Sequence, residues 1–257
     1  MPILYAHRGA ASERPENTLP SFERALELGA DALETDLHLT RDGHVVVSHD
    51  PSLARMSGAP VEIRHATLDE VRRCDVGWGF VDAGGERPFA GKGFRVPTLE
   101  EVLDAFPGVR WNVDVKQHDL ATIDAVLTLL RRKRAEERVL VASFASWVLH
   151  AVRHGGYAGR TGMGTADVLR VLAAPLPFLK RFPPSGKVAQ VPPRTRLLRA
   201  DTPRFLAKCH ALSIPVEYWT INDAREAERL LALGADGIMT DDPATIAPVF
   251  RRLREKR

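Results

Sequence analysis

The chain has 257 residues, and its 36 Lys and Arg side chains nearly balance 33 Asp and Glu side chains. Hydrophobic residues make up 44% and charged residues 27%, which excludes a disordered or fibrous chain. No run of about 18 apolar residues occurs, so we expect no membrane-spanning helix. The two cysteines, Cys74 and Cys209, cannot form a disulfide framework, and we expect a cytoplasmic protein.

Short aliphatic runs alternate with helical patterns along the chain. Residues 21–28 and 120–130 carry helical patterns of suitable length. Strands alternating with helices predict parallel β-α units, and about eight such units in about 250 residues favour a closed TIM (β/α)8 barrel over an open sheet. The predicted strands are residues 3–6, 32–39, 45–47, 109–115, 139–141, 187–191, 214–219 and 237–239.

The segment 51–97 breaks this rhythm. It contains seven glycines and only one short helical signal, at residues 68–73. We interpret it as an excursion beyond a barrel strand, because no linker, repeat or low-complexity tract marks a second domain. The prediction is therefore one domain over residues 1–257.

Acidic residues alternate with apolar residues in the predicted strand 32–39. Glu34, Asp36 and His38 share one face of this strand, because side chains alternate. Buried carboxylates are costly unless a charge compensates them, and hard divalent cations prefer carboxylate oxygens. The pattern indicates a metal site; the alternative is a solvent-exposed edge strand.

A second polar face lies on the predicted strand 109–115 and just beyond it. Asn112, Asp114 and Lys116 share this face, with valines between them. Asp114 can join the carboxylates of the first strand, and Lys116 can hold an anion. The alternative is a Lys–Asp pair with a purely structural role.

Two histidines follow predicted strands. His7 precedes Arg8 and Gly9, and His49 precedes Asp50. A lone histidine is more often structural than catalytic, but histidine is the side chain best suited to proton transfer near neutral pH. Phosphodiester cleavage needs an acid, a base and cations to stabilise the phosphoryl oxygens.

Motifs in matching order along almost the whole chain resemble the glycerophosphodiester phosphodiesterase family. They begin with His7-Arg8-Gly9 and end with a Gly-Ala-Asp-Gly-Ile-Met-Thr-Asp run. The final run is residues 234–241. The intervening matches are Pro15-Glu16-Asn17-Thr18, Glu34-x-Asp36, Thr40-x-Asp42-Gly43, Val46-Val47-x-His49-Asp50, residues 97–103, Asn112-x-Asp114-x-Lys116, Ser143-Phe144 and residues 219–222. The resemblance implies a TIM barrel with a small insertion after the second strand. It also implies metal-dependent hydrolysis of glycerophosphodiesters to glycerol 3-phosphate and an alcohol.

The resemblance also implies roles for individual residues. Mg²⁺ or Ca²⁺ is the implied cofactor, and His49 is favoured as the acid of the pair. The attacking oxygen is water or a substrate hydroxyl, and the sequence does not choose between them. The implied set is an acid–base pair of His7 and His49; metal ligands Glu34, Asp36 and Asp114; substrate contacts Arg8, Lys116 and Trp219; and support from Glu16 and Asn17.

The sequence departs from the family at one metal ligand. The family commonly has Glu where this chain has Asp114. Asp is shorter by one methylene group, so a direct bond from Asp114 to a metal requires a backbone shift, and the alternative is a contact through water.

A basic stretch follows the acidic half of the chain. Residues 1–150 hold 18 Lys and Arg against 23 Asp and Glu, whereas residues 151–257 hold 18 against 10. Residues 168–182 mix apolar bulk with cations, which suits a peripheral membrane contact and would make lysophospholipids substrates of a lysophospholipase D. The alternative is a helix packed on the barrel. We expect no nucleic-acid partner, because no reading motif appears. A degenerate phosphate-binding barrel is the non-enzyme alternative, and the oligomeric state is left open.

Overall fold

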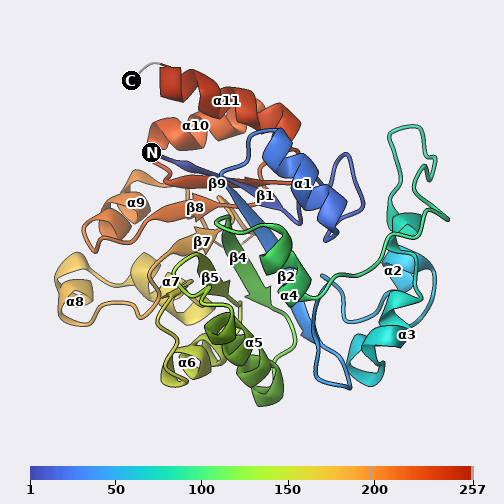
Figure 1. The fold of residues 1–257 in the computed structure, drawn as a ribbon. Coiled ribbons are helices and arrows are strands. Elements are labelled where there is room, and N and C mark those ends of the chain that lie inside the picture. The colour runs from blue at the N-terminus through green and yellow to red at the C-terminus, as the bar shows by residue number, and fades with distance from the viewer. Residues whose placement is uncertain (197, 256–257) are drawn as a thin grey trace.

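Parallel strands form a closed barrel in the computed structural model, which describes residues 1–196 and 198–255 (Figure 1). Within these ranges the barrel strands are β1 (Ile3–His7), β2 (Ala32–Leu39), β4 (Arg110–Val115), β5 (Val139–Ala142), β6 (Arg160–Thr161), β7 (Ala189–Val191), β8 (Val216–Tyr218) and β9 (Gly237–Thr240). They lie in the order β6-β5-β4-β2-β1-β9-β8-β7, and a parallel bridge between Gly162 and Val188 joins the two ends. The predicted TIM (β/α)8 fold is confirmed.

Amphipathic helices cover the outside of the barrel. They are α1 (Leu19–Glu27), α4 (Leu99–Ala105), α5 (Leu120–Arg132), α6 (Ser146–His154), α7 (Thr165–Ala173), α8 (Leu176–Arg181), α9 (Pro203–His210), α10 (Ala224–Leu233) and α11 (Pro243–Glu255). The aliphatic strand residues Leu33, Leu37 and Val113 are fully buried in one cluster with Phe22 of α1. Burial of such side chains stabilises the fold by about 1.5–3 kcal/mol each.

Two details of the strand prediction are wrong. Residues 45–47 form strand β3 (Val45–Val47), but β3 pairs antiparallel with the end of β2 and is no barrel strand. The missing eighth strand is β6, which has only two residues, Arg160 and Thr161. The sequence does not reveal strand β6, because two residues cannot form a run of apolar side chains. It does not distinguish strand β3 from a barrel strand, because hairpin strands and barrel strands have the same β-branched composition.

The insertion after β2 has a small hydrophobic core of its own. Its short elements are α2 (Ala54–Ser57), η1 (Ile63–His65), α3 (Leu68–Arg72) and η2 (Val76–Gly79), and they project to one side of the barrel (Figure 1). Leu53, Ile63 and Val71 are buried there with Val46 of β3. This packing joins the insertion to the end of β2. The assignment of residues 1–257 to a single domain stays a prediction.

The basic stretch 168–182 forms the end of α7 and all of α8. Ala174 and Pro175 separate the two helices, and Lys208 donates from α9 to the Val171 and Ala174 carbonyl oxygens. Val171 and Leu179 pack into the core of this half of the barrel. No helix in the described ranges is long and apolar enough to cross a membrane.

Candidate active site

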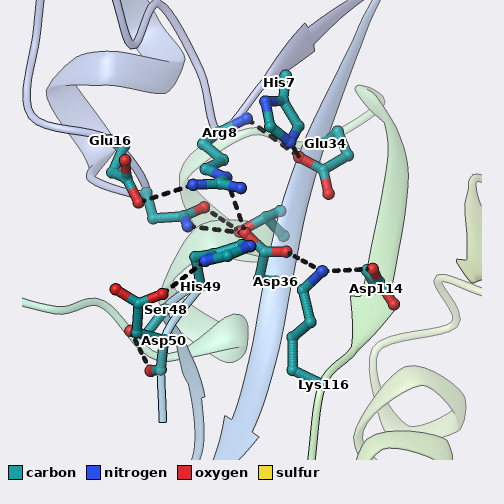
Figure 2. A network of polar contacts seen from close by, with 12 residues as sticks. His7, Arg8, Glu16, Glu34, Asp36, Ser48, His49, Asp50, Asp114 and Lys116 are labelled. Carbon is teal, nitrogen blue, oxygen red and sulfur yellow. Dashed lines mark hydrogen bonds and ion pairs between the residues drawn. The ribbon is translucent and has the colours of Figure 1, made fainter. Parts of the chain in front are cut away.

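A cavity of about 260 Å³ lies at the carboxyl ends of the barrel strands. Seven of the predicted site residues line it: His7, Arg8, Glu34, His49, Asp114, Lys116 and Trp219. The other three predicted residues do not line the cavity. Asp36 and Glu16 each form an ion pair with Arg8, and Asn17 donates a hydrogen bond to Asp36. The structure therefore brings the whole predicted set together. Figure 2 labels eight of these residues, together with Ser48 and Asp50, in one network of polar contacts.

His7 lies at the end of β1 between two carboxylates. Its Nδ1 is 2.6 Å from Asp241 Oδ1, and its Nε2 is 3.8 Å from Glu34 Oε2. Burial lowers the pKa of His7, but the charge of Glu34 and the hydrogen bond to Asp241 outweigh burial, so the pKa is raised overall. Asp241 fixes the ring through Nδ1, which leaves Nε2 free to exchange a proton in the cavity.

A tight turn after β1 carries Arg8. Its backbone N–H donates to Glu34 Oε2 at 3.1 Å, and Nη1 donates to Glu16 Oε1 at 3.2 Å. Arg8 has φ of 57° and Gly9 has φ of 87°. A Cβ at Gly9 would lie 2.4 Å from Ser21 Oγ, so the motif requires glycine there. The turn aims the guanidinium of Arg8 at the carboxylates of β2.

Three carboxylates face the cavity floor from neighbouring strands. Asp36 pairs with Asp114 in the register of β2 and β4, and Glu34 pairs with Asn112 one layer below. Lys116 Nζ lies between them, 3.1 Å from Asp36 Oδ1 and 2.7 Å from Asp114 Oδ2 (Figure 2). The alternation that the sequence predicted thus places both polar faces on the barrel interior, and the exposed edge strand is excluded.

The electrostatics of Glu34 and Asp36 differ although both are buried. Burial and the neighbouring charge of Asp36 raise the pKa of Glu34 to about 8. Burial also opposes the ionisation of Asp36, but Lys116 and Arg8 outweigh it and lower the pKa of this carboxyl. The two cations therefore keep Asp36 ionised, whereas burial and the charge of Asp36 favour the protonated form of Glu34 more than the nearby His7 and Arg8 oppose it.

Several buried oxygens at the site have no hydrogen-bond donor within residues 1–196 and 198–255. They include Asp114 Oδ1 and Asn112 Oδ1, which lie on the same face of β4. Buried polar atoms are rarely left without a partner, and uncompensated oxygen atoms suit a hard cation. The same ranges contain no group of three or more His, Cys, Asp or Glu side chains arranged so that it could hold a metal ion. The oxygen atoms of Asp114 and Asn112 are of the type that a divalent cation prefers, but Lys116 Nζ lies 2.7 Å from Asp114 Oδ2.

His49 is held by a second carboxylate and is more open than His7. Its Nδ1 is 2.7 Å from Asp50 Oδ1, and its side chain is 33% exposed, against 17% for His7. The backbone oxygen of His49 lies 3.3 Å from His38 Nε2. His38 shares the face of Glu34 and Asp36, and burial lowers its pKa. Both candidate catalytic histidines are therefore oriented through Nδ1.

Asn17 supports the floor from the turn after β1. Its Nδ2 donates to Asp36 Oδ2 at 3.1 Å, and its Oδ1 accepts from Thr35 Oγ1 at 2.7 Å. The side chain is buried, so both hydrogen bonds are shielded from water. Asn17 thereby orients Asp36, whose other oxygen faces Lys116.

The opposite wall of the cavity carries no charge. Phe144 packs edge-on against Trp219 with ring centroids 5.6 Å apart, and Lys116 Nζ lies 5.5 Å from the Phe144 ring centroid. Met163 and Gln190 complete this wall. Such a surface suits the carbon atoms of a substrate.

Sequence reasoning missed the partners that orient the site. It quoted Asp50, Phe144 and Asp241 within family motifs but gave them no role, and it did not single out Arg55. The position of Asp50 directly after His49 could have indicated its role as the partner of this histidine. The pairing of Asp241 with His7 spans 234 residues, so only the closed barrel reveals it.

Comparisons with known proteins point to one family. Residues 7–245 match the sequence model of the glycerophosphoryl diester phosphodiesterase family. The glycerophosphodiester phosphodiesterase of Caldanaerobacter subterraneus subsp. tengcongensis is 30% identical over 264 residues, which cover 97% of this chain and 98% of that protein.

Two further relatives extend this similarity. Lysophospholipase D GDPD1 of Homo sapiens is 28% identical over 267 residues, which cover 94% of this chain and 83% of that protein. The crystal structure of glycerophosphodiester phosphodiesterase from Thermotoga maritima superposes with a TM-score of 0.74 at 26% identity, covering 99% of both chains.

Proposed function

Because this chain belongs to the glycerophosphoryl diester phosphodiesterase family, we propose that it hydrolyses glycerophosphodiesters to glycerol 3-phosphate and an alcohol with two histidines and a divalent cation. One observation carries the proposal. His7 and His49, each held through Nδ1 by a carboxylate, line the same cavity as Arg8, Lys116 and two of three clustered carboxylates. A degenerate binding barrel would have no need to keep both oriented histidines.

Proton transfer is the proposed task of the two histidines. An attacking oxygen, from water or from a substrate hydroxyl, forms a new bond to phosphorus while the bond from phosphorus to the alcohol oxygen breaks. We assign His7 as the base that takes a proton from the attacking oxygen and His49 as the acid that protonates the departing alkoxide. The greater exposure of His49 supports this order, because the alcohol must leave towards solvent.

Arg8 and Lys116 are the proposed contacts of the phosphate. Both cations already form ion pairs with Asp36. When a phosphate binds, Arg8 and Lys116 can therefore contact its oxygens from positions at which they already neutralise an anion. The ion pairs with Asp36 and Asp114 outweigh burial and raise the pKa of Lys116, which keeps its ammonium protonated. The two side chains stabilise negative charge that builds on the phosphoryl oxygens.

A divalent cation completes the proposal. Glu34, Asp36 and Asp114 would hold Mg²⁺ or Ca²⁺, and the unpaired oxygens of Asp114 and Asn112 support this assignment. When bound, such an ion supplies positive charge beside the phosphoryl oxygens. The remaining chemistry lies with the side chains described above.

Hydrolysis of glycerophosphocholine with and without a chelator tests this function. We expect release of glycerol 3-phosphate that stops when the metal is removed and returns with Mg²⁺ or Ca²⁺. Activity that a chelator leaves unchanged would remove the cation from the proposal, and no turnover in metal-loaded protein would refute the function itself. Turnover in isotope-labelled water, with a search for a cyclic phosphodiester, distinguishes the two attacking oxygens. Incorporation of label into the product without any cyclic species would exclude attack by the substrate hydroxyl.

Lysophospholipase D activity at a membrane surface is a second candidate. Leu169, Phe178 and Phe182 of the α7–α8 region are 44%, 47% and 51% exposed, and Arg170 and Arg181 stack beside the two phenylalanines. Exposed apolar groups flanked by cations suit the interface of anionic lipids. Co-sedimentation with phosphatidylserine vesicles tests it; no binding at low salt would count against it.

A further inference from the structure

A single arginine of the insertion connects the supports of two proposed active-site residues. Arg55 lies in the four-residue helix α2 and contacts two carboxylates at once. Its Nε donates to Asp50 Oδ2 at 2.5 Å, while Nη2 and Nη1 donate to Glu16 Oε1 and Oε2 at 2.7 and 3.1 Å. The planar guanidinium can bridge two carboxylates in this way because its five donors are fixed in one fork.

Each of these carboxylates holds one residue of the cavity. Asp50 Oδ1 accepts a hydrogen bond from His49 Nδ1 at 2.7 Å, and Glu16 Oε1 accepts one from Arg8 Nη1 at 3.2 Å. The chain of contacts therefore runs from the proposed acid to the proposed phosphate contact, with Arg55 at its centre. Arg55 lines no part of the cavity.

The helix that carries Arg55 is anchored. Leu53 precedes this helix and Met56 lies within it, and both are buried in the core of the insertion. Ser57 Oγ donates to the Leu53 carbonyl oxygen, and Gly58 ends the helix in the left-handed conformation. An anchored backbone can impose a position on the two carboxylates, whereas a mobile one would follow them.

We infer that Arg55 is a positioning residue that fixes His49 and Arg8 relative to each other through Asp50 and Glu16. The inference rests on the proposed function, because it concerns the alignment of an acid and a phosphate contact. Misplacement of reacting groups by about 1 Å can cost about 100-fold in rate. The small insertion thereby takes part in catalysis without touching substrate.

A purely structural role is the competing explanation, and the chain offers a matched control for it. Arg72 of α3 also joins the insertion to the barrel, through an ion pair with Glu101 of α4 at 2.5 Å. This pair lies outside the cavity. If Arg55 only fastens the insertion, Arg55→Gln and Arg72→Gln should behave alike.

Steady-state hydrolysis of glycerophosphocholine by the full chain tests the inference. We expect Arg55→Gln to lower kcat and raise KM, with a loss in kcat/KM of about 10- to 100-fold, and Arg72→Gln to change neither by more than about 2-fold. Asp50→Asn should act mainly on kcat, through His49, and Glu16→Gln mainly on KM, through Arg8. Equal kinetics of Arg55→Gln and Arg72→Gln would overturn the inference.

Combined variants separate positioning from other effects. In the background Asp50→Asn/Glu16→Gln, Arg55→Gln should cause almost no further loss, because its partners no longer carry charge. An undiminished loss there would also overturn the inference. Arg55→Lys keeps the charge but lacks the fork, so it should fold normally and still lose activity, which keeps the test valid should Arg55→Gln unfold. An inactive wild-type protein would instead refute the proposed function.

Discussion

The two walls of the cavity differ in nearly every chemical respect. Strands β1 to β4 and the turns that follow them supply the charged or titratable lining residues, among them His7, Glu34 and Lys116. Strands β5 to β9 supply uncharged lining residues such as Phe144, Met163 and Trp219. In the proposed function, the charged wall transfers protons and binds phosphate, whereas the other wall offers mainly apolar surface with a few uncharged polar groups such as Gln190.

We expect the charged wall to determine the rate of the reaction and the uncharged wall to determine which substrate alcohol binds. Variation in the uncharged wall would change which alcohol fits, whereas variation in the charged wall would change the rate for every substrate. The barrel permits such a division because each strand presents its own loop at the same rim.

The largest effect is expected from the histidines of the charged wall. His7→Ala or His49→Ala should each lower kcat by roughly 10²–10⁴-fold, because each removes one proton-transfer group. The measurement is turnover of glycerophosphocholine at saturating substrate. His38→Ala is the control, since His38 faces the same strand surface, and its side-chain hydrogen bond within residues 1–196 and 198–255 is to the backbone oxygen of His49. Near-normal turnover in both single variants would refute the acid–base pair.

A smaller but coupled effect is expected at the third carboxylate. Asp114→Ala should lower activity and Mg²⁺ or Ca²⁺ affinity together, each by about 10- to 100-fold. Calorimetric titration of the metal and turnover measured on the same samples provide the check. Asp114→Glu restores the residue common in the family and should retain both properties. Unchanged metal dependence in Asp114→Ala would remove Asp114 from the ligand set.

The uncharged wall should respond in affinity and not in rate. Trp219→Ala should raise KM for glycerophosphocholine about 3- to 10-fold, which corresponds to about 1 kcal/mol of lost aromatic contact, and leave kcat nearly unchanged. Trp219→Phe keeps an aromatic face and serves as the control. A loss confined to kcat would show that Trp219 belongs functionally with the charged wall.

The smallest effect concerns the stability of the metal-free protein. Folding raises the pKa of Glu34 from 4.5 to about 8, through burial and the charge of Asp36. For a carboxyl whose pKa is raised on folding, the contribution to stability is fully present when the pH is below the pKa in the unfolded chain. This contribution is lost as the pH rises from about 4.5 through about 8. The melting temperature of chelator-treated protein should therefore fall over this range.

Glu34→Gln should flatten that fall without abolishing it. Glu217 remains as a second buried carboxyl whose pKa burial raises, so part of the slope persists. An identical pH profile in wild type and variant would show that Glu34 is ionised in the folded state at low pH. Added Mg²⁺ or Ca²⁺ should raise the melting temperature of wild type at the upper end of the range.

The charged wall was predictable from sequence to a degree that the rest of the site was not. Alternating side chains place Glu34, Asp36 and Asp114 on interior faces by strand geometry alone, and the structure agrees. Asp241 and Arg55 could not be found in this way, because their partners are distant in sequence and belong to different elements. Their contacts depend on barrel closure and on the packing of the insertion.

The fold prediction failed where the local sequence carries little information. The two residues of β6 are strand only because β5 lies beside them, and their side chains, Arg160 and Thr161, give no apolar signal. The three valines of Val45–Val47 strongly favour a strand, but they do not indicate whether it pairs parallel or antiparallel with its neighbour. Tertiary pairing decides both cases.

The contact between His7 and Asp241 has a consequence for the growing chain. It joins the end of the first barrel strand to the residue after the last one, so the proposed base gains its orienting carboxylate only when β9 pairs with β1. During synthesis, all residues up to Asp241 must emerge before that pair can form. Catalytic competence would then arise late and all at once, and an incomplete chain would carry most of the site without the ability to use it.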